Sequence, residues 1–196
     1  MYLLGINGSM RKDGNTNILI DTVFKSAKKQ NPKITSKILQ MSNLDIQPCG
    51  SCYEKCCVKP CKCVIKNDDL AVVCDELKAA DAVVIGSPLY FNIPARLTAL
   101  IERLICLSYF YQMRGFKGAE PLENIPCGLI AVSGGNDTMP VLQHLLNFAL
   151  FVKMKPVFLK SYPYIGISGR GGYKDSIEEA KTLGGLLVKS IAAQKT

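Results

Sequence analysis

MYLLGINGSMRKDGNTN, residues 1–17, is the stretch that decides the fold. Its first seven residues are mostly apolar and predict a short buried strand, which suits the middle of a parallel sheet. Small and polar residues follow at 8–17, and ILIDTVF then has helical spacing. Hydroxyls and backbone N–H groups at the start of a helix can hold an anion. The loop therefore predicts a phosphate site, although an ordinary strand–helix turn with an N-cap accounts for the same pattern.

The spacing inside this loop excludes two common nucleotide sites. The loop lacks the Gly-Lys-Ser/Thr ending of a Walker loop. It also lacks the G-x-G-x-x-G pattern of dinucleotide-binding folds. What remains is a loop of Ser, Thr and Asn suited to the terminal phosphate of a mononucleotide, which is the chemistry of a flavodoxin-like FMN site.

Length and composition predict one domain, 1–196, with a packed core, because the chain has 196 residues of which 48% are hydrophobic. The net charge of +8 would suit a phosphorylated cofactor, an acidic protein or nucleic acid. The lysines are scattered rather than gathered in a basic stripe with aromatics, so nucleic acid is not the expected partner. No secretory signal and no membrane span are expected, since Glu102-Arg103 and Gln143-His144 interrupt the longest apolar segments. We therefore expect a cytoplasmic protein, in which the nine cysteines are not a disulfide framework.

The rest of the chain alternates between strand and helix patterns. Predicted strands lie at 1–7, 34–39, 82–86, 125–133 and 156–159, predicted helices at 16–29, 67–80, 94–111, 139–153 and 177–192, and a cysteine-rich loop at about 41–66. This alternation predicts an α/β fold with a doubly wound parallel sheet of five strands and helices on both faces. The expected strand order is the flavodoxin-like 2-1-3-4-5, with the cysteine-rich loop after strand 2.

In that order three loops meet at the carboxyl edge of the sheet: 8–17, 87–92 and 133–137. The second loop carries Tyr90 and Phe91, which are suited to contact with a flat isoalloxazine ring, while the third offers small residues on the other side. Tyr90 and Phe91 taken singly are also explained as core residues before a helix. Three compatible loops at three strand ends favour a flavin.

Four segments, GSMRKDGNTN, SPLYFNIPARLTALIER, VSGG and GRGGYKDSIEEAKTLGGLL, resemble the NADPH-dependent FMN reductase and iron–sulfur flavoprotein superfamily over nearly the whole chain. One departure is a loop after Tyr90 that is one residue short and lacks a glycine found in many relatives. The resemblance implies FMN as cofactor. The matching positions are Ser9, Arg11, Asn15, Thr16 and Asn17 around the phosphate, Pro88, Leu89, Tyr90, Phe91 and Asn92 around the ring, and Ser133, Gly134 and Gly135 opposite.

Six cysteines fall within fifteen residues: Cys49, Cys52, Cys56, Cys57, Cys61 and Cys63. Thiolates this close in a reducing compartment indicate a metal or a cluster, and a tetrahedral zinc site competes with an iron–sulfur cubane. The resemblance implies a [4Fe–4S] cluster with Cys49 and Cys52 as its first two ligands and Cys63 as its last. The family usually has two residues between the second and third ligands, whereas Cys56 leaves three here and Cys57 four; Cys56 is the third ligand we predict, with Cys57 and Cys61 as substitutes. The remaining cysteines, Cys74, Cys106 and Cys127, lie in apolar segments and are expected to be small core residues.

The leading functional hypothesis is an iron–sulfur flavoprotein that passes electrons from a ferredoxin-like donor through the cluster to FMN and on to a small-molecule acceptor. It needs no catalytic acid or base, because the cofactors carry the chemistry. The positive charge suits an acidic ferredoxin, and relatives imply a homodimer or homotetramer. One alternative is an NAD(P)H-dependent FMN or quinone reductase with structural cysteines. Another is a non-enzymatic zinc-loop binding module on the same scaffold.

Overall fold

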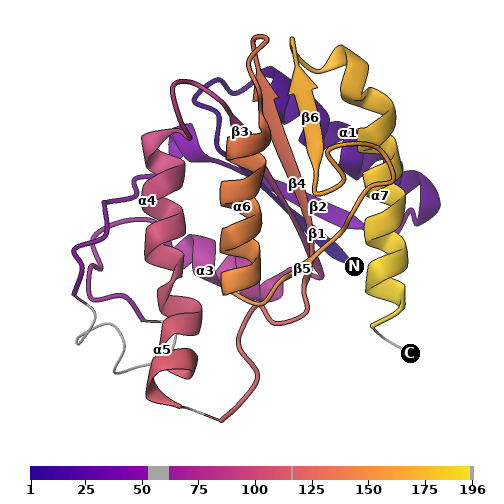
Figure 1. Cartoon of the computed structure of the whole chain (residues 1–196). Coiled ribbons are helices and arrows are strands. Elements are labelled where there is room, and N and C mark those ends of the chain that lie inside the picture. The colour runs from indigo at the N-terminus through magenta and orange to yellow at the C-terminus, as the bar shows by residue number, and fades with distance from the viewer. Residues whose placement is uncertain (53–61, 116, 195–196) are drawn as a thin grey trace.

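The computed structural model describes residues 1–52, 62–115 and 117–194. Within these ranges the strands are β1 (Tyr2–Asn7), β2 (Thr35–Gln40), β3 (Ala82–Pro88), β4 (Pro126–Ser133), β5 (Lys155–Pro156) and β6 (Ile167–Arg170). They pair in parallel in the order β2-β1-β3-β4-β5, and β6 also pairs with β4 (Figure 1). The predicted flavodoxin-like order 2-1-3-4-5 is confirmed.

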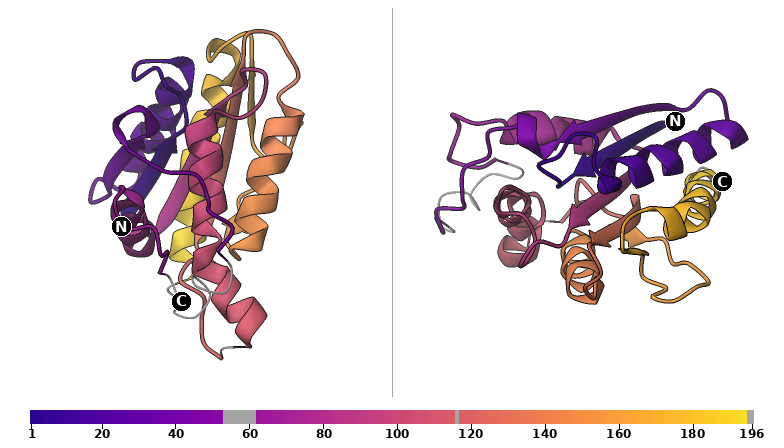
Figure 2. Two further views of the ribbon diagram at one scale, coloured as in Figure 1. Left: turned by 90° about the vertical axis from the view of Figure 1, so that its left-hand side faces the viewer. Right: turned by 90° about the horizontal axis from the view of Figure 1, so that it is seen from above.

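Helices cover both faces of this sheet. They are α1 (Asn15–Gln30), α3 (Leu70–Ala79), α4 (Ala95–Leu104), α5 (Cys106–Arg114), α6 (Met139–Phe151) and α7 (Ile177–Ala192), with short 3-10 turns η1 (Met41–Asn43) and η2 (Lys174–Ser176). α1 and α7 pack on one face, and α3, α4 and α6 on the other (Figure 2). Across the described ranges, none of these helices combines the length and the apolar character needed to cross a bilayer.

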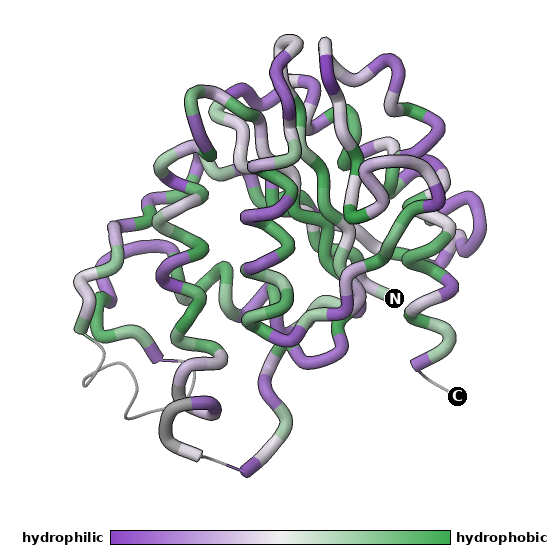
Figure 3. Tube along the Cα trace, viewed as in Figure 1, coloured by the Kyte–Doolittle hydropathy of each residue, from purple (hydrophilic) through white to green (hydrophobic). Residues whose placement is uncertain are grey.

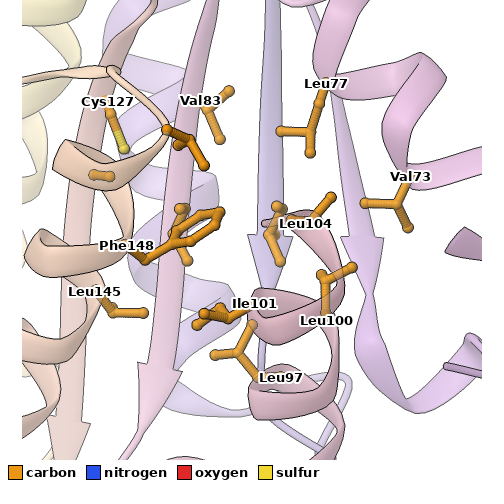
Figure 4. Packing of buried hydrophobic residues seen from close by; sticks show 14 of the residues in the cluster. Val73, Leu77, Val83, Leu97, Leu100, Ile101, Leu104, Cys127, Leu145 and Phe148 are labelled. Atoms are coloured by element: carbon orange, nitrogen blue, oxygen red, sulfur yellow. The ribbon is translucent and has the colours of Figure 1, made fainter. Parts of the chain in front are cut away.

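Apolar side chains on both faces of the central strands form the core. Figure 3 shows hydrophobic residues along the strands and an alternation of hydrophobic and hydrophilic residues along the helices. Figure 4 shows Val83 of β3, Leu100 and Leu104 of α4 and Phe148 of α6 as members of one buried cluster between the sheet and these helices. Burying a side chain of this size contributes about 1.5–3 kcal/mol. This core fixes the strand ends from which the functional loops leave.

Two elements that the sequence predicted as continuous are each divided in the structure. The single helix expected at 94–111 is two helices, α4 and α5, which meet at Ile105. Apolar spacing continues through that junction, so periodicity alone does not reveal it. The fifth strand, expected at 156–159, is instead divided into β5 and β6. Both pair with β4, because β4 is long enough to accept one at its start and the other at its end.

Candidate functional site

A cavity of about 740 Å³ lies where the three predicted loops meet, at the carboxyl ends of β1, β3 and β4. This volume is within the range of pockets that bind small ligands and cofactors. The cavity brings together nine of the predicted flavin-site residues: Ser9, Arg11, Asn15, Thr16, Pro88, Leu89, Tyr90, Ser133 and Gly134. Its wall also includes Lys12, Asp13, Gly14, Val132, Gly171 and Gly172. The other predicted residues, Asn17, Phe91, Asn92 and Gly135, are not in this lining, and their contact with FMN stays a prediction.

The polar end of the cavity is the start of α1. Gly14, in an extended conformation, precedes the helix, and no side chain caps it. The first turn carries no acidic residue. The first N–H groups of a helix have no intrahelical acceptor and lie at the positive end of its dipole. Because the buried Ser9 and Thr16 lie in the same wall, this end is built to bind an anion.

Two buried amides that the sequence analysis did not single out support this loop. Asn7 ends β1 and Gln40 ends β2, directly opposite each other in the strand register. The Asn7 Nδ2 donates to Gln40 Oε1 at 2.7 Å, and Gln40 Nε2 donates to the Ser9 carbonyl at 2.5 Å. Asn7 Oδ1 accepts from the Ser9 N–H at 3.0 Å. The amides therefore fix the first residues of the loop to the sheet.

Gln40→Leu is expected to lower the free energy of unfolding by about 1–2 kcal/mol, because it leaves the buried amide of Asn7 and the Ser9 carbonyl without their partner. Urea unfolding followed by circular dichroism measures this change. Gln143→Leu is the control, since Gln143 is exposed and, among the described residues, its side chain bonds to Asn147 of its own helix alone. Equal unfolding midpoints for the two variants would contradict a supporting role for Gln40.

The loop after β3 forms a tight turn beside the cavity. The Leu89 N–H donates to the Val132 carbonyl at 2.7 Å, which ties this loop to β4. The Tyr90 N–H donates to the Asn92 carbonyl at 3.1 Å, and the Asn92 side chain turns back to accept from the Ile93 N–H at 2.8 Å. Tyr90 is half exposed and lines the cavity, whereas Phe91 is fully exposed outside that lining. In this conformation Tyr90, and not Phe91, is therefore placed to contact an aromatic ring bound in the cavity.

The remaining wall combines the loop after β4 with a segment after β6. The Ser133 hydroxyl donates to the Asn136 carbonyl at 2.5 Å, and Asp137 forms an ion pair with Arg170. Gly171 and Gly172 have φ angles of 74° and 119°, a region that favours glycine. The sequence singled out their GRGG segment only as part of a resemblance, and its paired glycines are the signal for the positive φ angles found here.

A second cavity, of about 250 Å³, contains three of the four predicted metal ligands, Cys49, Cys52 and Cys63. Cys56, like Cys57 and Cys61, lies outside the described residues. In the ranges that the structure describes, no group of three or more His, Cys, Asp or Glu side chains is arranged to hold a metal ion. The three thiols thus share a cavity without forming a closed site. They supply the soft donors that iron–sulfur clusters and zinc require.

The helical wall of this cysteine cavity comes from Glu102, Arg103, Ile105, Cys106 and Tyr109. Cys106 was predicted to be a small core residue, and it is buried, yet it also lines the cavity. Cys127 lies away from both cavities, where full burial raises the pKa of its thiol to about 12. It fits the predicted role of a small, inert core residue.

Among known protein families, the model described as NADPH-dependent FMN reductase matches residues 1–163 of this chain. This match includes all three predicted loops and the cysteine-rich segment. An iron–sulfur flavoprotein of Methanocaldococcus jannaschii is 30% identical over 159 residues, covering 79% of this chain and 74% of the relative. An iron–sulfur flavoprotein of Archaeoglobus fulgidus is 26% identical over 210 residues, covering 100% of this chain and 98% of the relative.

A solved structure extends the comparison to the fold. The structure of RosB with bound 8-demethyl-8-formylriboflavin-5'-phosphate has a TM-score of 0.70 and 16% sequence identity, covering 100% of this chain and 81% of that one. At this identity the likeness shows the fold alone.

Proposed function

The chain belongs to the NADPH-dependent FMN reductase family, and from this premise we propose that it is an iron–sulfur flavoprotein that transfers electrons between a cysteine-bound [4Fe–4S] cluster and FMN. The family makes it an FMN-dependent oxidoreductase. When bound, FMN exchanges one or two electrons and the cluster exchanges one, so the pair would link one-electron and two-electron partners.

The cavity at the carboxyl edge is the observation that carries the flavin half of the proposal. Its uncapped helix start, with Ser9 and Thr16 buried beside it, would hold the terminal phosphate. Arg11 or Lys12 would balance the phosphate charge at the same end. Leu89 and Tyr90 would contact one side of the ring, with Ser133 and Gly134 opposite. These groups bind and orient the cofactor, and no acid or base is required of them.

The cluster half rests on the second cavity. Cys49, Cys52 and Cys63 all line it, although Cys49 and Cys63 are more than ten residues apart in the sequence. Cys56 is the proposed fourth ligand. The two relatives described above carry iron–sulfur in their names. We propose a ferredoxin-like donor for this centre, a small-molecule acceptor at the flavin, and a homodimer or homotetramer as the assembly.

The second candidate is an NAD(P)H-dependent FMN or quinone reductase, which the family description itself favours by naming NADPH. In that case the cysteine cavity would be structural, and the nicotinamide would deliver electrons directly to the flavin. The non-enzymatic zinc-loop module is set aside, because the family is one of oxidoreductases.

The visible spectrum of anaerobically purified and reconstituted protein separates the two candidates. Flavin bands with a broad iron–sulfur shoulder are expected for the leading proposal. Flavin bands alone, bleached by NADPH, would favour the reductase. Absence of both iron and flavin after reconstitution would overturn the proposal.

Cys63→Ser is expected to lose most of its iron and to keep its FMN, because the substitution removes one proposed thiolate ligand and leaves the other cavity untouched. Iron analysis and flavin absorbance on the same sample measure the two contents. Cys127→Ala is the matched control, as Cys127 lies in the core and lines neither cavity. Iron content equal to wild type in Cys63→Ser would remove Cys63 from the ligand set.

A further inference from the structure

Arg103, near the end of α4, has no exposed side-chain surface. An arginine is almost never fully buried unless it is paired. Arg103 Nη1 donates to Asp68 Oδ2 at 2.5 Å, and Nη2 lies 3.3 Å from Asp68 Oδ1. The pair is thus bidentate, and Asp68 is as deeply buried as its partner. The sequence predicted for this residue only that the charged pair Glu102-Arg103 interrupts an apolar segment.

The remaining donors of Arg103 reach the cysteine-bearing loop on both of its arms. On the first arm, Nη1 donates to the Gln47 carbonyl at 2.9 Å, two residues before Cys49. On the second arm, Nη2 donates to the Ile65 carbonyl at 3.2 Å. The Gln47 N–H also bonds to Asp68 Oδ2 at 3.0 Å, which closes the base of the loop. A single guanidinium therefore joins the two ends of the segment that carries the proposed ligands.

The last donor of Arg103 is directed at a proposed ligand. Arg103 Nε lies 3.2 Å from Cys63 Sγ. A metal-bound cysteine is a thiolate, so this contact becomes a charge-assisted hydrogen bond when the centre is loaded. Hydrogen bonds to ligand sulfurs orient the ligands and help set the reduction potential of an iron–sulfur centre. The guanidinium is fixed by Asp68 and by two carbonyls, so its Nε is held in place before any metal arrives.

We propose that Arg103 is the positioning residue of the cysteine centre. It holds the two arms of the loop together, orients Cys63, and stabilises negative charge on that sulfur. The inference rests on the proposed function, because it assumes that Cys63 is a ligand. Its consequences are tighter metal binding and a less negative reduction potential than the same cysteines would have without the guanidinium.

Arg96 provides a matched control on the same helix. Its guanidinium also binds the start of this loop, donating to the carbonyls of Ser42 at 3.0 Å and Leu44 at 3.1 Å. Within the described ranges the hydrogen bonds of Arg96 go to carbonyl oxygens and not to a sulfur, and the residue is exposed. A purely structural role in tying the loop to α4 is therefore shared by both arginines, whereas the sulfur contact belongs to Arg103.

Anaerobic titration of the metal-free, reduced full chain with Co²⁺ tests the proposal, because thiolate-to-cobalt absorption reports the cysteine centre directly. Arg103→Gln is expected to weaken Co²⁺ binding by about 10- to 100-fold, and Arg96→Gln to leave it unchanged. Arg103→Lys keeps a cation beside Asp68 but lacks the planar fork, so it is also expected to bind Co²⁺ more weakly than wild type. In iron-reconstituted protein, the reduction potential of Arg103→Gln should be more negative than that of wild type. FMN binding, followed by fluorescence quenching, should be equal in all variants.

The outcomes separate the inference from the proposed function. Wild-type affinity and potential in Arg103→Gln would overturn the role of Arg103 and leave the iron–sulfur proposal standing. Equal weakening of Co²⁺ binding in Arg103→Gln and Arg96→Gln would also overturn it. That result would mean that both arginines act only by tying the loop to α4. If Arg103→Gln fails to bind FMN and is therefore misfolded, the Co²⁺ affinity and reduction potential of Arg103→Lys are compared with those of wild type instead. A wild-type protein that takes up FMN but neither cobalt nor iron would overturn both the cluster and the inference.

Discussion

Asp68→Ala is expected to lower the free energy of unfolding by about 3–5 kcal/mol, because it leaves the buried guanidinium of Arg103 without a counter-charge. Neither side chain of this pair is more than 1% exposed, so water does not replace the missing carboxylate. The Gln47 and Leu70 N–H groups lose their acceptor as well. Urea unfolding of the apo protein, followed by circular dichroism, measures the difference.

Asp69→Ala is the control for this prediction. Asp69 is the next residue in the chain, and its carboxylate likewise accepts a backbone N–H from the loop, that of Asp45 at 2.8 Å. It pairs with no buried cation in the described part of the chain, so its loss should cost about 1 kcal/mol or less. Similar losses in the two variants would show that the ion pair with Arg103 contributes little beyond a loop hydrogen bond.

The same ion pair makes part of the folding stability depend on acid pH. Burial alone would raise the pKa of Asp68, but the hydrogen bonds from Arg103 and from the Gln47 and Leu70 N–H groups outweigh it, and the pKa lies below its ordinary value of 3.8. A carboxyl with a lowered folded-state pKa stabilises the fold fully above its unfolded pKa and loses that contribution as pH falls through the folded value. Wild type should therefore lose stability below about pH 4 more steeply than Asp68→Asn does. Parallel pH profiles would contradict this assignment.

The strand order was predictable because each strand pattern alternates with a helix pattern, and right-handed crossovers leave few arrangements for such a chain. Residues 157–159 show where the pattern stops being informative. Val157 and Leu159 are buried and Phe158 is exposed, which is the alternation of a strand. Yet the Leu159 N–H bonds to the Tyr164 carbonyl rather than to β4. Alternation predicts which side chains are buried, but it does not say whether a neighbouring strand is within reach.

The convergence of the three loops on one cavity was predictable, since loops that follow these three strands meet at the carboxyl edge of any sheet of this order. The supporting residues were not. Gln40 reaches the loop after β1 only because β2 lies beside β1 in a register that puts it opposite Asn7. Arg103 meets Asp68 across 35 positions of sequence, and helical periodicity treats it as an ordinary polar residue. Such residues depend on tertiary geometry, which spacing within one segment does not contain.

α4 leads from the loop beside the first cavity to the wall of the second. It begins directly after the loop of Tyr90 and ends beside Arg103, and Figure 1 shows that it runs from the carboxyl edge of the sheet towards the cysteine loop. Ten helical residues span about 15 Å. The helix therefore sets the separation of the proposed flavin and metal centres within one chain. Because its inner face is packed in the core, that separation is fixed by Leu97, Leu100 and Leu104.

Gly86→Val is expected to weaken FMN binding by about 100-fold and to lower the free energy of unfolding by about 3 kcal/mol. Gly86 lies in β3 beneath the first turn of α1. A Cβ atom there would come within 2.7 Å of Thr16 Cγ2 and 2.9 Å of Ile20 Cδ1. Thr16 is buried and lines the cavity, so relief of the clash must displace the helix start that is proposed to hold the phosphate. Binding FMN would require α1 to return against that strain, and about 3 kcal/mol corresponds to roughly 100-fold in affinity.

Gly5→Val distinguishes this local effect from general overpacking. Gly5 lies in the neighbouring strand β1, and its Cβ would meet the same helix farther from the cavity, at 2.8 Å from Ile20 Cγ2 and 3.1 Å from Phe24 Cζ. Both variants should therefore lose stability, while only Gly86→Val should lose FMN affinity by about 100-fold. Fluorescence-quenching titration with FMN, at a temperature where both variants are folded, measures the difference. Equal affinities would mean that the position of the α1 start does not control FMN binding, and the phosphate would then have to be held elsewhere in the cavity.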